Sequence, residues 1–146
     1  MLLDLSVTKS IIINASVHHV WKALTDPAII KIYLYDTNTL TDWKIGSEII
    51  FEGEYEGHKY RDHGFIKENI NGEKISYSYW SVFSGLEDKP ENYSTVTYEL
   101  VSINDNETKL TWIQKGYASE QNHQHSEKGM DAFLQQLKQT VENLKQ

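Results

Sequence analysis

Two histidines near the C-terminus have the residue types and spacing of a metal site. His123 and His125 are separated by one residue, and Glu120 and Glu127 lie on either side of them. On a strand, residues i and i+2 share a face, so both imidazoles could reach one ion. On a helix, each residue turns the chain by about 100°, and the two side chains would point to nearly opposite sides. The secondary structure of this segment therefore decides its chemistry.

Apolar residues at helical spacing follow the two histidines directly. They are Met130, Phe133, Leu134, Leu137, Val141 and Leu144. His123, seven residues before Met130, falls near the centre of this stripe, whereas His125 falls on the opposite side. We therefore predict that His123 faces the interior, that His125 faces water, and that the chain uses no metal and no other cofactor. A metal site would need the helix to begin after His125, and it would still offer only two imidazoles where zinc sites use three or four ligands.

The sequence RDHG places Asp62 beside His63, and an Asp-His pair can carry out general acid-base catalysis when the two side chains touch. Adjacent strand residues face opposite sides of a sheet, so we expect these two not to meet. The chain contains neither the nucleophile elbow of a serine hydrolase nor a phosphate-binding glycine loop. We predict no catalytic residue, although a fold that joins Asp62, His63, Tyr79 or His123 would leave an enzyme as an alternative.

The composition excludes several classes of protein. With 14 basic and 21 acidic residues the net charge is -7, so no positive field attracts phosphate backbones, and we predict no nucleic-acid partner. The absence of cysteine excludes disulfides and thiolate catalysis. The first apolar run contains Asp4 and has no basic leader, and no apolar run reaches the roughly 20 residues of a membrane span. We expect one cytoplasmic domain over residues 1–146, with no membrane span.

Alternating and helical patterns divide the chain into strands and helices. We expect two short helices within residues 16–34, after the first strand, and a long C-terminal helix. The expected strands cover residues 3–13, a run that ends near residue 53, and residues 58–70, 73–80, 93–103 and 108–117. Because most of these strands follow one another directly, they indicate an antiparallel meander.

This element order predicts an α+β fold. A curved antiparallel sheet of about six strands would wrap around the long C-terminal helix, which would pack across the sheet over a cavity. The irregular residues 83–92 could form a loop at the mouth of that cavity.

Five segments, in this order, resemble the START-like (SRPBCC) helix-grip superfamily. They are VHHVWKALTDPAIIKIYL, TDWKIGSEIIFEG, YRDHGFIKENINGEKISYSYW, STVTYELVSINDNETKLTWIQKGY and HSEKGMDAFLQQLKQTVE. The subgroup that they resemble is similar to the C-terminal domain of activators of the 90-kDa heat-shock protein ATPase. The resemblance implies the helix-grip (Bet v 1-like) fold with an interior cavity. The functions that it implies are binding of hydrophobic or aromatic small molecules, cyclase-type catalysis, or assistance to chaperones. The resemblance does not choose among them, because one fold hosts many activities.

Two features depart from the family pattern. Relatives usually carry Gly-Trp on the terminal helix where this chain has Gly129-Met130, so a flexible thioether replaces a rigid aromatic ring at the contact between helix and sheet. We expect the missing side chain of Gly129 to let helix and sheet approach. Eukaryotic activators also have a separate N-terminal domain that binds the chaperone. We expect the 146 residues to leave none over to supply one, which makes the chaperone function the less favoured.

Aromatic residues of the expected strands and of the terminal helix are the candidates for a ligand site. Alternation puts Tyr77 and Tyr79 on one face and Trp80 on the other, and buried Tyr and Trp need partners for their polar atoms. We predict a ligand cavity lined by Trp43, Phe51, Tyr60, Tyr79, Tyr98, Trp112, His123, Met130 and Phe133. The favoured function is binding of a hydrophobic, aromatic or lipid-like small molecule. The alternatives are a chaperone-associated protein of the stress response and a cofactor-free, polyketide cyclase-like enzyme.

Overall fold

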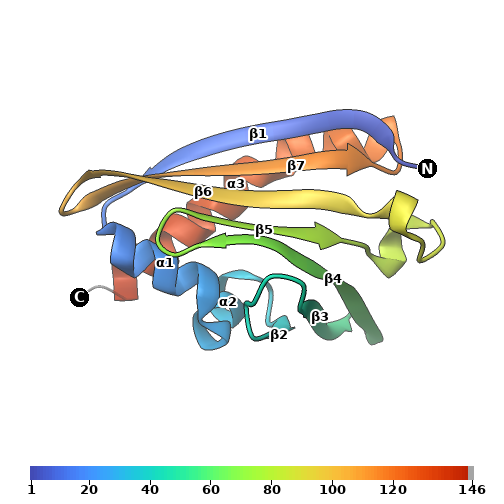
Figure 1. Ribbon diagram of the computed structural model, residues 1–146, viewed down its shortest axis with the longest axis horizontal. Coiled ribbons are helices and arrows are strands. Elements are labelled where there is room, and N and C mark those ends of the chain that lie inside the picture. The colour runs from blue at the N-terminus through green and yellow to red at the C-terminus, as the bar shows by residue number, and fades with distance from the viewer. Residues whose placement is uncertain (145–146) are drawn as a thin grey trace.

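A seven-stranded antiparallel sheet curves around one long helix (Figure 1). The computed structural model describes residues 1–144. The strands are β1 (Leu3–Ile13), β2 (Asn38–Leu40), β3 (Glu48–Tyr55), β4 (His58–Ile70), β5 (Lys74–Tyr79), β6 (Ser94–Asn104) and β7 (Glu107–Tyr117). The helices are α1 (Val17–Thr25), α2 (Pro27–Tyr33) and α3 (Glu120–Leu144), and two short 3₁₀ turns are η1 (Val82–Ser84) and η2 (Pro90–Asn92).

The strands from β2 to β7 form a meander, in which each pairs with the next along the chain. The sheet order is β1-β7-β6-β5-β4-β3-β2, so the first strand joins the sheet beside the last one. The predicted α+β helix-grip fold is confirmed, and the strand that the sequence missed is β2. This strand has three residues, of which Thr39 pairs with Phe51 of β3. Three residues are too few to show the alternation that identifies a strand.

Each of the two short helices begins at a residue whose side chain caps it. Ser16 Oγ accepts a hydrogen bond from the backbone N–H of His19 (3.3 Å) at the start of α1. Asp26 Oδ1 accepts one from the N–H of Ala28 (2.9 Å), and Pro27 is the first residue of α2. Such caps satisfy N–H groups that have no partner within the helix, and proline is favoured at the first helical position. The two predicted short helices are thereby confirmed.

Helix α3 begins at Glu120, so it contains both histidines, and it lies over β1 and β7. The residues of the predicted stripe that it buries are Phe133, Leu134, Leu137 and Val141. Polar contacts hold it to β1: Lys9 Nζ lies 3.0 Å from Glu127 Oε1, and Lys138 Nζ donates to the carbonyl oxygen of Ile12 (2.8 Å). The helix is therefore fixed along one side of the sheet.

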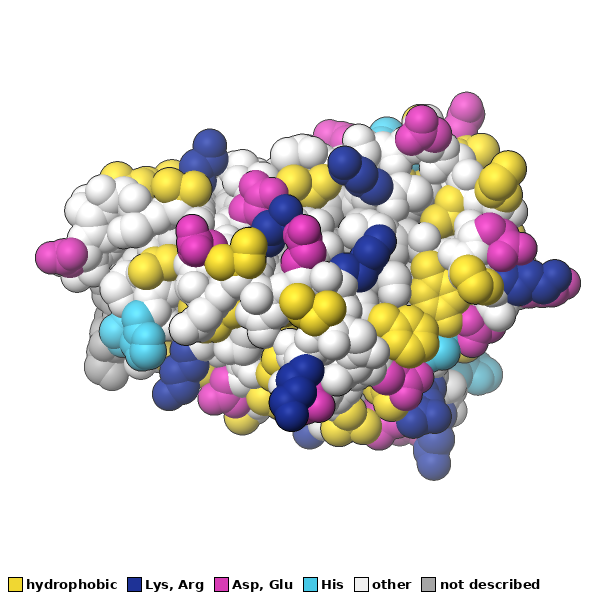
Figure 2. Space-filling model, viewed as in Figure 1, with side chains coloured by type: hydrophobic (Ala, Val, Ile, Leu, Met, Phe, Trp, Pro, Cys, Tyr) yellow, Lys and Arg dark blue, Asp and Glu magenta, His cyan; other side chains and the backbone are white. Residues whose placement is uncertain are grey.

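Acidic and basic side chains are interspersed over the face of the molecule shown in Figure 2, with scattered apolar side chains between them. None of the helices within residues 1–144 is both long enough and apolar enough to cross a membrane.

Two glycines occupy opposite environments. Gly64 of β4 lies so close to β5 that a Cβ atom there would be 1.6 Å from the carbonyl oxygen of Ser78. Gly129 lies on the exposed side of α3, and a Cβ atom there would meet nothing within 4 Å. The expectation that Gly129 lets helix and sheet approach is wrong, because this residue is exposed and has open space where its side chain would be. The close approach in this fold is at Gly64.

We predict opposite effects on stability for alanine at these two positions. Gly64→Ala should lower the free energy of unfolding by about 3 kcal/mol or more, because a backbone oxygen cannot move aside without breaking strand pairing. Gly129→Ala should raise it by about 0.5–1 kcal/mol, since alanine has the higher helix propensity. Urea unfolding of both variants checks this. A destabilising Gly129→Ala would mean that the helix packs more closely at this point than described.

Candidate functional site

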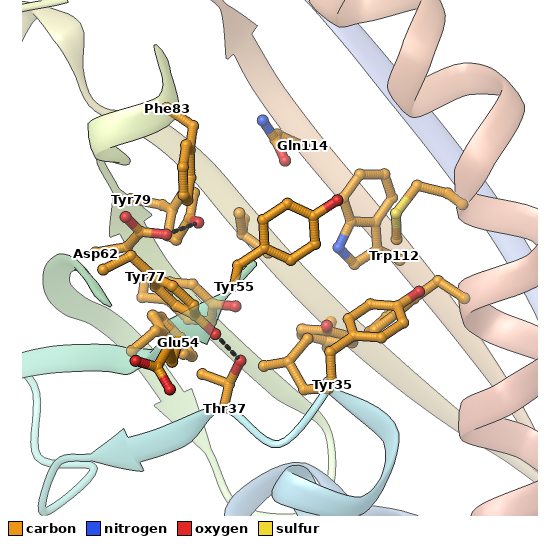
Figure 3. A pocket seen from close by; sticks show the side chains of 17 residues that line it. Tyr35, Thr37, Glu54, Tyr55, Asp62, Tyr77, Tyr79, Phe83, Trp112 and Gln114 are labelled. Carbon is orange, nitrogen blue, oxygen red and sulfur yellow. Dashed lines mark hydrogen bonds between the residues drawn. The ribbon is translucent and has the colours of Figure 1, made fainter. Parts of the chain in front are cut away.

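A pocket of about 730 Å³ opens between α3, the concave face of the sheet and the segment that joins α2 to β2 (Figure 3). Ten of its 17 lining residues are aromatic, so most of its wall is apolar and flat. The lining residues are Leu34, Tyr35, Thr37, Phe51, Glu54, Tyr55, Tyr60, Asp62, Tyr77, Tyr79, Phe83, Val96, Tyr98, Trp112, Gln114, Met130 and Phe133.

Strand alternation explains how the sheet contributes its part of this wall. Residues two apart on one strand share a face, which places Tyr77 with Tyr79 on β5 and Trp112 with Gln114 on β7. Phe51 of β3 packs against both tyrosines of β5, with ring centroids 5.5 Å and 5.8 Å apart. The floor of the pocket is thus a set of rings held against one another.

Three exposed aromatic side chains form the rim. Tyr35 follows α2, Tyr55 ends β3, and Phe83 belongs to η1. The ring of Phe83 lies 6.0 Å from that of Tyr60, which closes the pocket on the side of η1. In Figure 3, Tyr35 and Tyr55 reach from one side of the pocket toward Trp112 on the other.

The polar atoms of the pocket are partly paired with one another. The hydroxyls of Thr37 and Tyr60 are 2.5 Å apart, and the Tyr79 hydroxyl donates to Asp62 Oδ2 at 2.8 Å. Burial raises the pKa of the Tyr77 and Tyr98 hydroxyls well above the usual range of tyrosine, and burial together with the Asp62 carboxylate does the same for Tyr79. These phenols therefore stay neutral. The Tyr79 hydroxyl already donates its hydrogen to Asp62, so it can only accept a hydrogen bond from a ligand.

Seven of the nine residues predicted to line a cavity lie on the wall of this pocket. They are Phe51, Tyr60, Tyr79, Tyr98, Trp112, Met130 and Phe133. Trp43 does not, because it has a positive φ of 66° in the connection between β2 and β3, where strand alternation no longer sets its direction. Its side chain instead borders a separate gap of about 20 Å³ beside Tyr33 and Ile49.

His123 also lies outside the pocket wall. It faces the sheet as predicted, but α3 begins over β1, so Nε2 donates to the carbonyl oxygen of Ser6 (2.9 Å) and the ring meets Tyr117 edge-on at 5.1 Å. His125 is exposed on another side of the helix and borders a second pocket of about 310 Å³. Since both histidines are helical, they cannot share one ion. Within residues 1–144 no three His, Cys, Asp or Glu side chains are placed to hold a metal ion.

Sequence reasoning missed several residues of the pocket. Tyr77 and Val96 could have been found, because they share a strand face with the predicted Tyr79 and Tyr98, respectively. Tyr35, Tyr55 and Phe83 could not, since they lie at or beyond the ends of regular elements, where no periodicity gives a direction.

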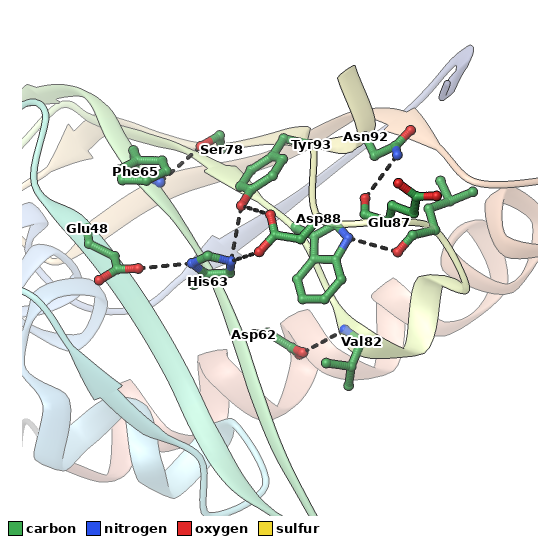
Figure 4. A network of polar contacts seen from close by, with 12 residues as sticks. Glu48, Asp62, His63, Phe65, Ser78, Val82, Glu87, Asp88, Asn92 and Tyr93 are labelled. Atoms are coloured by element: carbon green, nitrogen blue, oxygen red, sulfur yellow. Dashed lines mark hydrogen bonds and ion pairs between the residues drawn. The ribbon is translucent and has the colours of Figure 1, made fainter. Parts of the chain in front are cut away.

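Asp62 and His63 face opposite sides of β4, as the sequence predicted. Asp62 is only 5% exposed and accepts from the Tyr79 hydroxyl and from the backbone N–H of Val82 (3.2 Å). On the other side, His63 Nδ1 lies 2.9 Å from Glu48 Oε2, and Nε2 lies 2.7 Å from Asp88 Oδ2 (Figure 4). The two residues therefore do not form a catalytic pair.

The His63 contacts fix the segment that carries Phe83. The Tyr93 hydroxyl donates to Asp88 Oδ1 and lies 3.0 Å from His63 Nε2, so Asp88 is held by two partners. Asp62 holds the other end of the same segment at Val82. The rim of the pocket at η1 is thus tied to the sheet at two points.

The pKa of His63 gives a test of this attachment. Desolvation lowers this pKa, but the hydrogen bonds and charges of Glu48 and Asp88 outweigh that effect, and the pKa is raised. The stabilisation is therefore fully present below the unfolded-state pKa of about 6.5 and is lost as the pH rises through the folded-state value. We predict that His63→Gln removes this component of the pH dependence, measured by urea unfolding between about pH 6 and about pH 9.

His18→Gln is the matched control, because His18 is exposed on α1. It should keep the component of the pH dependence that His63 contributes. A direct NMR titration that gives His63 an unshifted or lowered pKa would contradict the network in Figure 4.

Comparison with known proteins supports the fold and gives the family. The model of the family "Activator of Hsp90 ATPase homolog 1-like protein" matches residues 14–142. No curated protein matches the sequence.

Several solved structures are similar to this chain. The solution structure of ChR145 from Cytophaga hutchinsonii is 35% identical, with 98% of this chain and 97% of that one covered and a TM-score of 0.82. NE0264 from Nitrosomonas europaea is 20% identical over 97% and 96% of the two chains, with a TM-score of 0.75. PFC0360w, an HSP90 activator from Plasmodium falciparum, is 20% identical over 77% and 73%, with a TM-score of 0.62.

The last two likenesses show a shared fold, whereas the family model covers most of the sequence itself. The START-like resemblance of the five segments is therefore confirmed, and the chain belongs to the family of Activator of Hsp90 ATPase homolog 1-like proteins.

Proposed function

We propose that this protein binds a small, largely aromatic hydrophobic molecule in the pocket between α3 and the sheet. The observation that carries the proposal is the pocket itself: about 730 Å³, with ten aromatic residues among the 17 that line it. Ligand sites in proteins usually have volumes of roughly 300–1,000 Å³ and mostly apolar walls with a few polar groups. This pocket has both properties.

The walls favour a flat ligand of moderate size. Aromatic rings pack best against other rings, in offset or edge-on arrangements. The hydroxyls of Tyr60 and Tyr79 and the amide of Gln114 offer polar contacts at separate points of the wall. An aromatic body with one or two polar substituents would therefore match the pocket better than a purely aliphatic chain.

Ligand binding should raise the melting temperature of the protein. A ligand that binds only the folded state, at about 100 times its Kd, adds about 2.7 kcal/mol to the free energy of unfolding. For a domain of this size we expect an upward shift of about 5–10 °C with the best members of a panel of neutral aromatic compounds. N-phenylnaphthylamine serves as a fluorescent member, and calorimetry gives the stoichiometry. A panel without any shift would contradict the proposal.

Met130 allows the site of binding to be tested. Met130→Trp places a larger, rigid side chain in the pocket and should weaken the binding of N-phenylnaphthylamine by about tenfold, which corresponds to about 1.4 kcal/mol. Met130→Ala, the matched variant, leaves the pocket open and should change the Kd much less. Equal affinity for both variants would place the ligand elsewhere on the molecule.

A second candidate function is association with a chaperone. It is favoured by the family match and by the likeness to a Plasmodium protein that is described as an HSP90 activator. For both functions we propose a cytoplasmic location.

The chaperone candidate predicts binding and activation. The cognate heat-shock protein should be retained by the immobilised domain, and its ATPase rate should rise when the domain is added. We would measure both with the Gly129→Ala variant beside the unmodified chain, because that exposed change should alter neither result unless α3 is the docking surface. No retention together with an unchanged ATPase rate would remove this candidate.

A further inference from the structure

We propose that the ligand of the aromatic pocket carries a positive charge, as an amine or a quaternary ammonium group attached to an aromatic body. This inference rests on the proposed binding function and specifies its ligand class. It is carried by the signs of the charges on the pocket wall, by the environment of Asp62 and by the number of aromatic faces around them.

Every formally charged side chain on the wall is acidic. The 17 lining residues include Glu54 and Asp62 and contain no lysine, arginine or histidine. The buried Tyr77 and Tyr98 stay protonated and neutral, because burial raises the pKa of both hydroxyls. A carboxylate or phosphate ligand would therefore meet two negative charges and no positive one. Like charges brought together are unfavourable, most of all at the buried Asp62, so the wall discriminates against anions.

Asp62 lacks a positive partner. It is 5% exposed, and its oxygens accept from two neutral donors, the Tyr79 hydroxyl and the Val82 N–H. No ion pair joins it to a lysine, arginine or histidine within the described residues 1–144. A buried carboxylate is costly unless it is paired, and an ionised carboxylate can accept more than two hydrogen bonds. A ligand ammonium in the pocket would supply the missing opposite charge.

The aromatic wall suits the same group. The faces of tyrosine and tryptophan rings carry negative electrostatic potential and attract cations placed within about 6 Å of the ring centre. Six tyrosines and Trp112 line the pocket. Two of those tyrosines, Tyr35 and Tyr55, stand at the rim, and Tyr55 directly follows Glu54 in the sequence. A cation would therefore find favourable surroundings both at the entrance and at Asp62.

The electrostatic field of the whole molecule also favours a cationic ligand. The net charge of -7 favours the approach of cations over that of anions. Glu54 is exposed, so it contributes to attraction at the entrance, whereas Asp62 contributes to binding inside. The two carboxylates are expected to affect the association rate and the affinity, respectively.

A series of ligands that share one aromatic body and differ in the charge of a short substituent tests the proposal on the unmodified protein. Naphthylethylamine, naphthylethanol and naphthylacetate have the same aromatic body with a positive, a neutral and a negative substituent. We expect the amine to bind about tenfold or more tightly than the carboxylate, with the alcohol between them, when calorimetry is performed at neutral pH. N-methylation of the amine to the quaternary ammonium should retain most of the affinity if the rings hold the charge.

Variants identify the carboxylate responsible. Asp62→Asn should weaken binding of the amine by about tenfold and leave binding of the alcohol nearly unchanged. Asp105→Asn, in the turn between β6 and β7, removes the same amount of charge away from the pocket and should change neither Kd. Because Asp62 also holds Val82, the unliganded melting temperature of Asp62→Asn is measured as well, and the ligand series remains decisive if this variant does not fold.

The outcomes separate this inference from the proposed function. Binding of the alcohol or the carboxylate as tightly as the amine overturns the cation proposal and leaves aromatic ligand binding intact. Binding of none of the three, together with a neutral panel that gives no thermal shift, overturns both. A preference for the amine that survives in Asp62→Asn but is lost in Asp105→Asn also overturns the assignment, because the charge recognised would then lie outside the pocket.

Discussion

One helix cannot cover a seven-stranded sheet, and the pocket follows from this constraint. Strands lie about 4.8 Å apart, so seven of them span roughly 29 Å, whereas a helix with its side chains is about 10–12 Å wide. Helix α3 lies over β1 and β7, where ion pairs and hydrogen bonds from Lys9 and Lys138 hold it. The part of the concave face formed by β3 to β6 must be covered in another way. The short helices cover one end of it, and the remainder is lined by aromatic side chains around an open space.

The position of the pocket rim depends on the alternation of side chains along β4. Asp62 and His63 are adjacent on β4 and face opposite sides of the sheet, yet both hold the same segment of chain. Asp62 binds Val82 from the pocket side, and His63 binds Asp88 from the other side. A strand places neighbouring side chains on opposite faces without cost, so two consecutive residues can fasten one loop at two points. Phe83 lies between these attachments and packs on Tyr60.

The sequence predicted the direction of many side chains where a regular element repeats its period, although Leu144 at the end of the stripe is half exposed. The stripe of α3 identified Phe133, Leu134 and Leu137 as buried, and strand alternation placed Asp62 and His63 on opposite faces. The family resemblance supplied the arrangement of helix and sheet, which local periodicity cannot provide.

The surroundings of three residues could not be predicted, because they depend on where helices and strands begin and end and on how they pack. Trp43 has a positive φ in a connection, so neither strand nor helix period gives its direction. His123 faces the sheet, as predicted. Because this part of α3 lies over β1, the His123 side chain contacts Ser6 and does not reach the pocket. We expected a packing role for Gly129 from a family motif, but it is exposed with open space beside it, although Phe133, one turn further along α3, is buried. Long-range packing fixes these features, and they leave no signature in neighbouring residues.

The pocket also lies between two parts of the hydrophobic core. One cluster includes Leu110, Leu134 and Leu137, and a smaller one consists of Ile49, Phe51, Ile66 and Ile75. Tyr77, Tyr79 and Tyr98 pack against both clusters and also line the pocket. An aromatic molecule bound there would contact side chains of both clusters and extend their packing across the open space. Ligand affinity and stability of the fold would then depend on the same tyrosines, because the surfaces that recognise the ligand are those that join the two halves of the core.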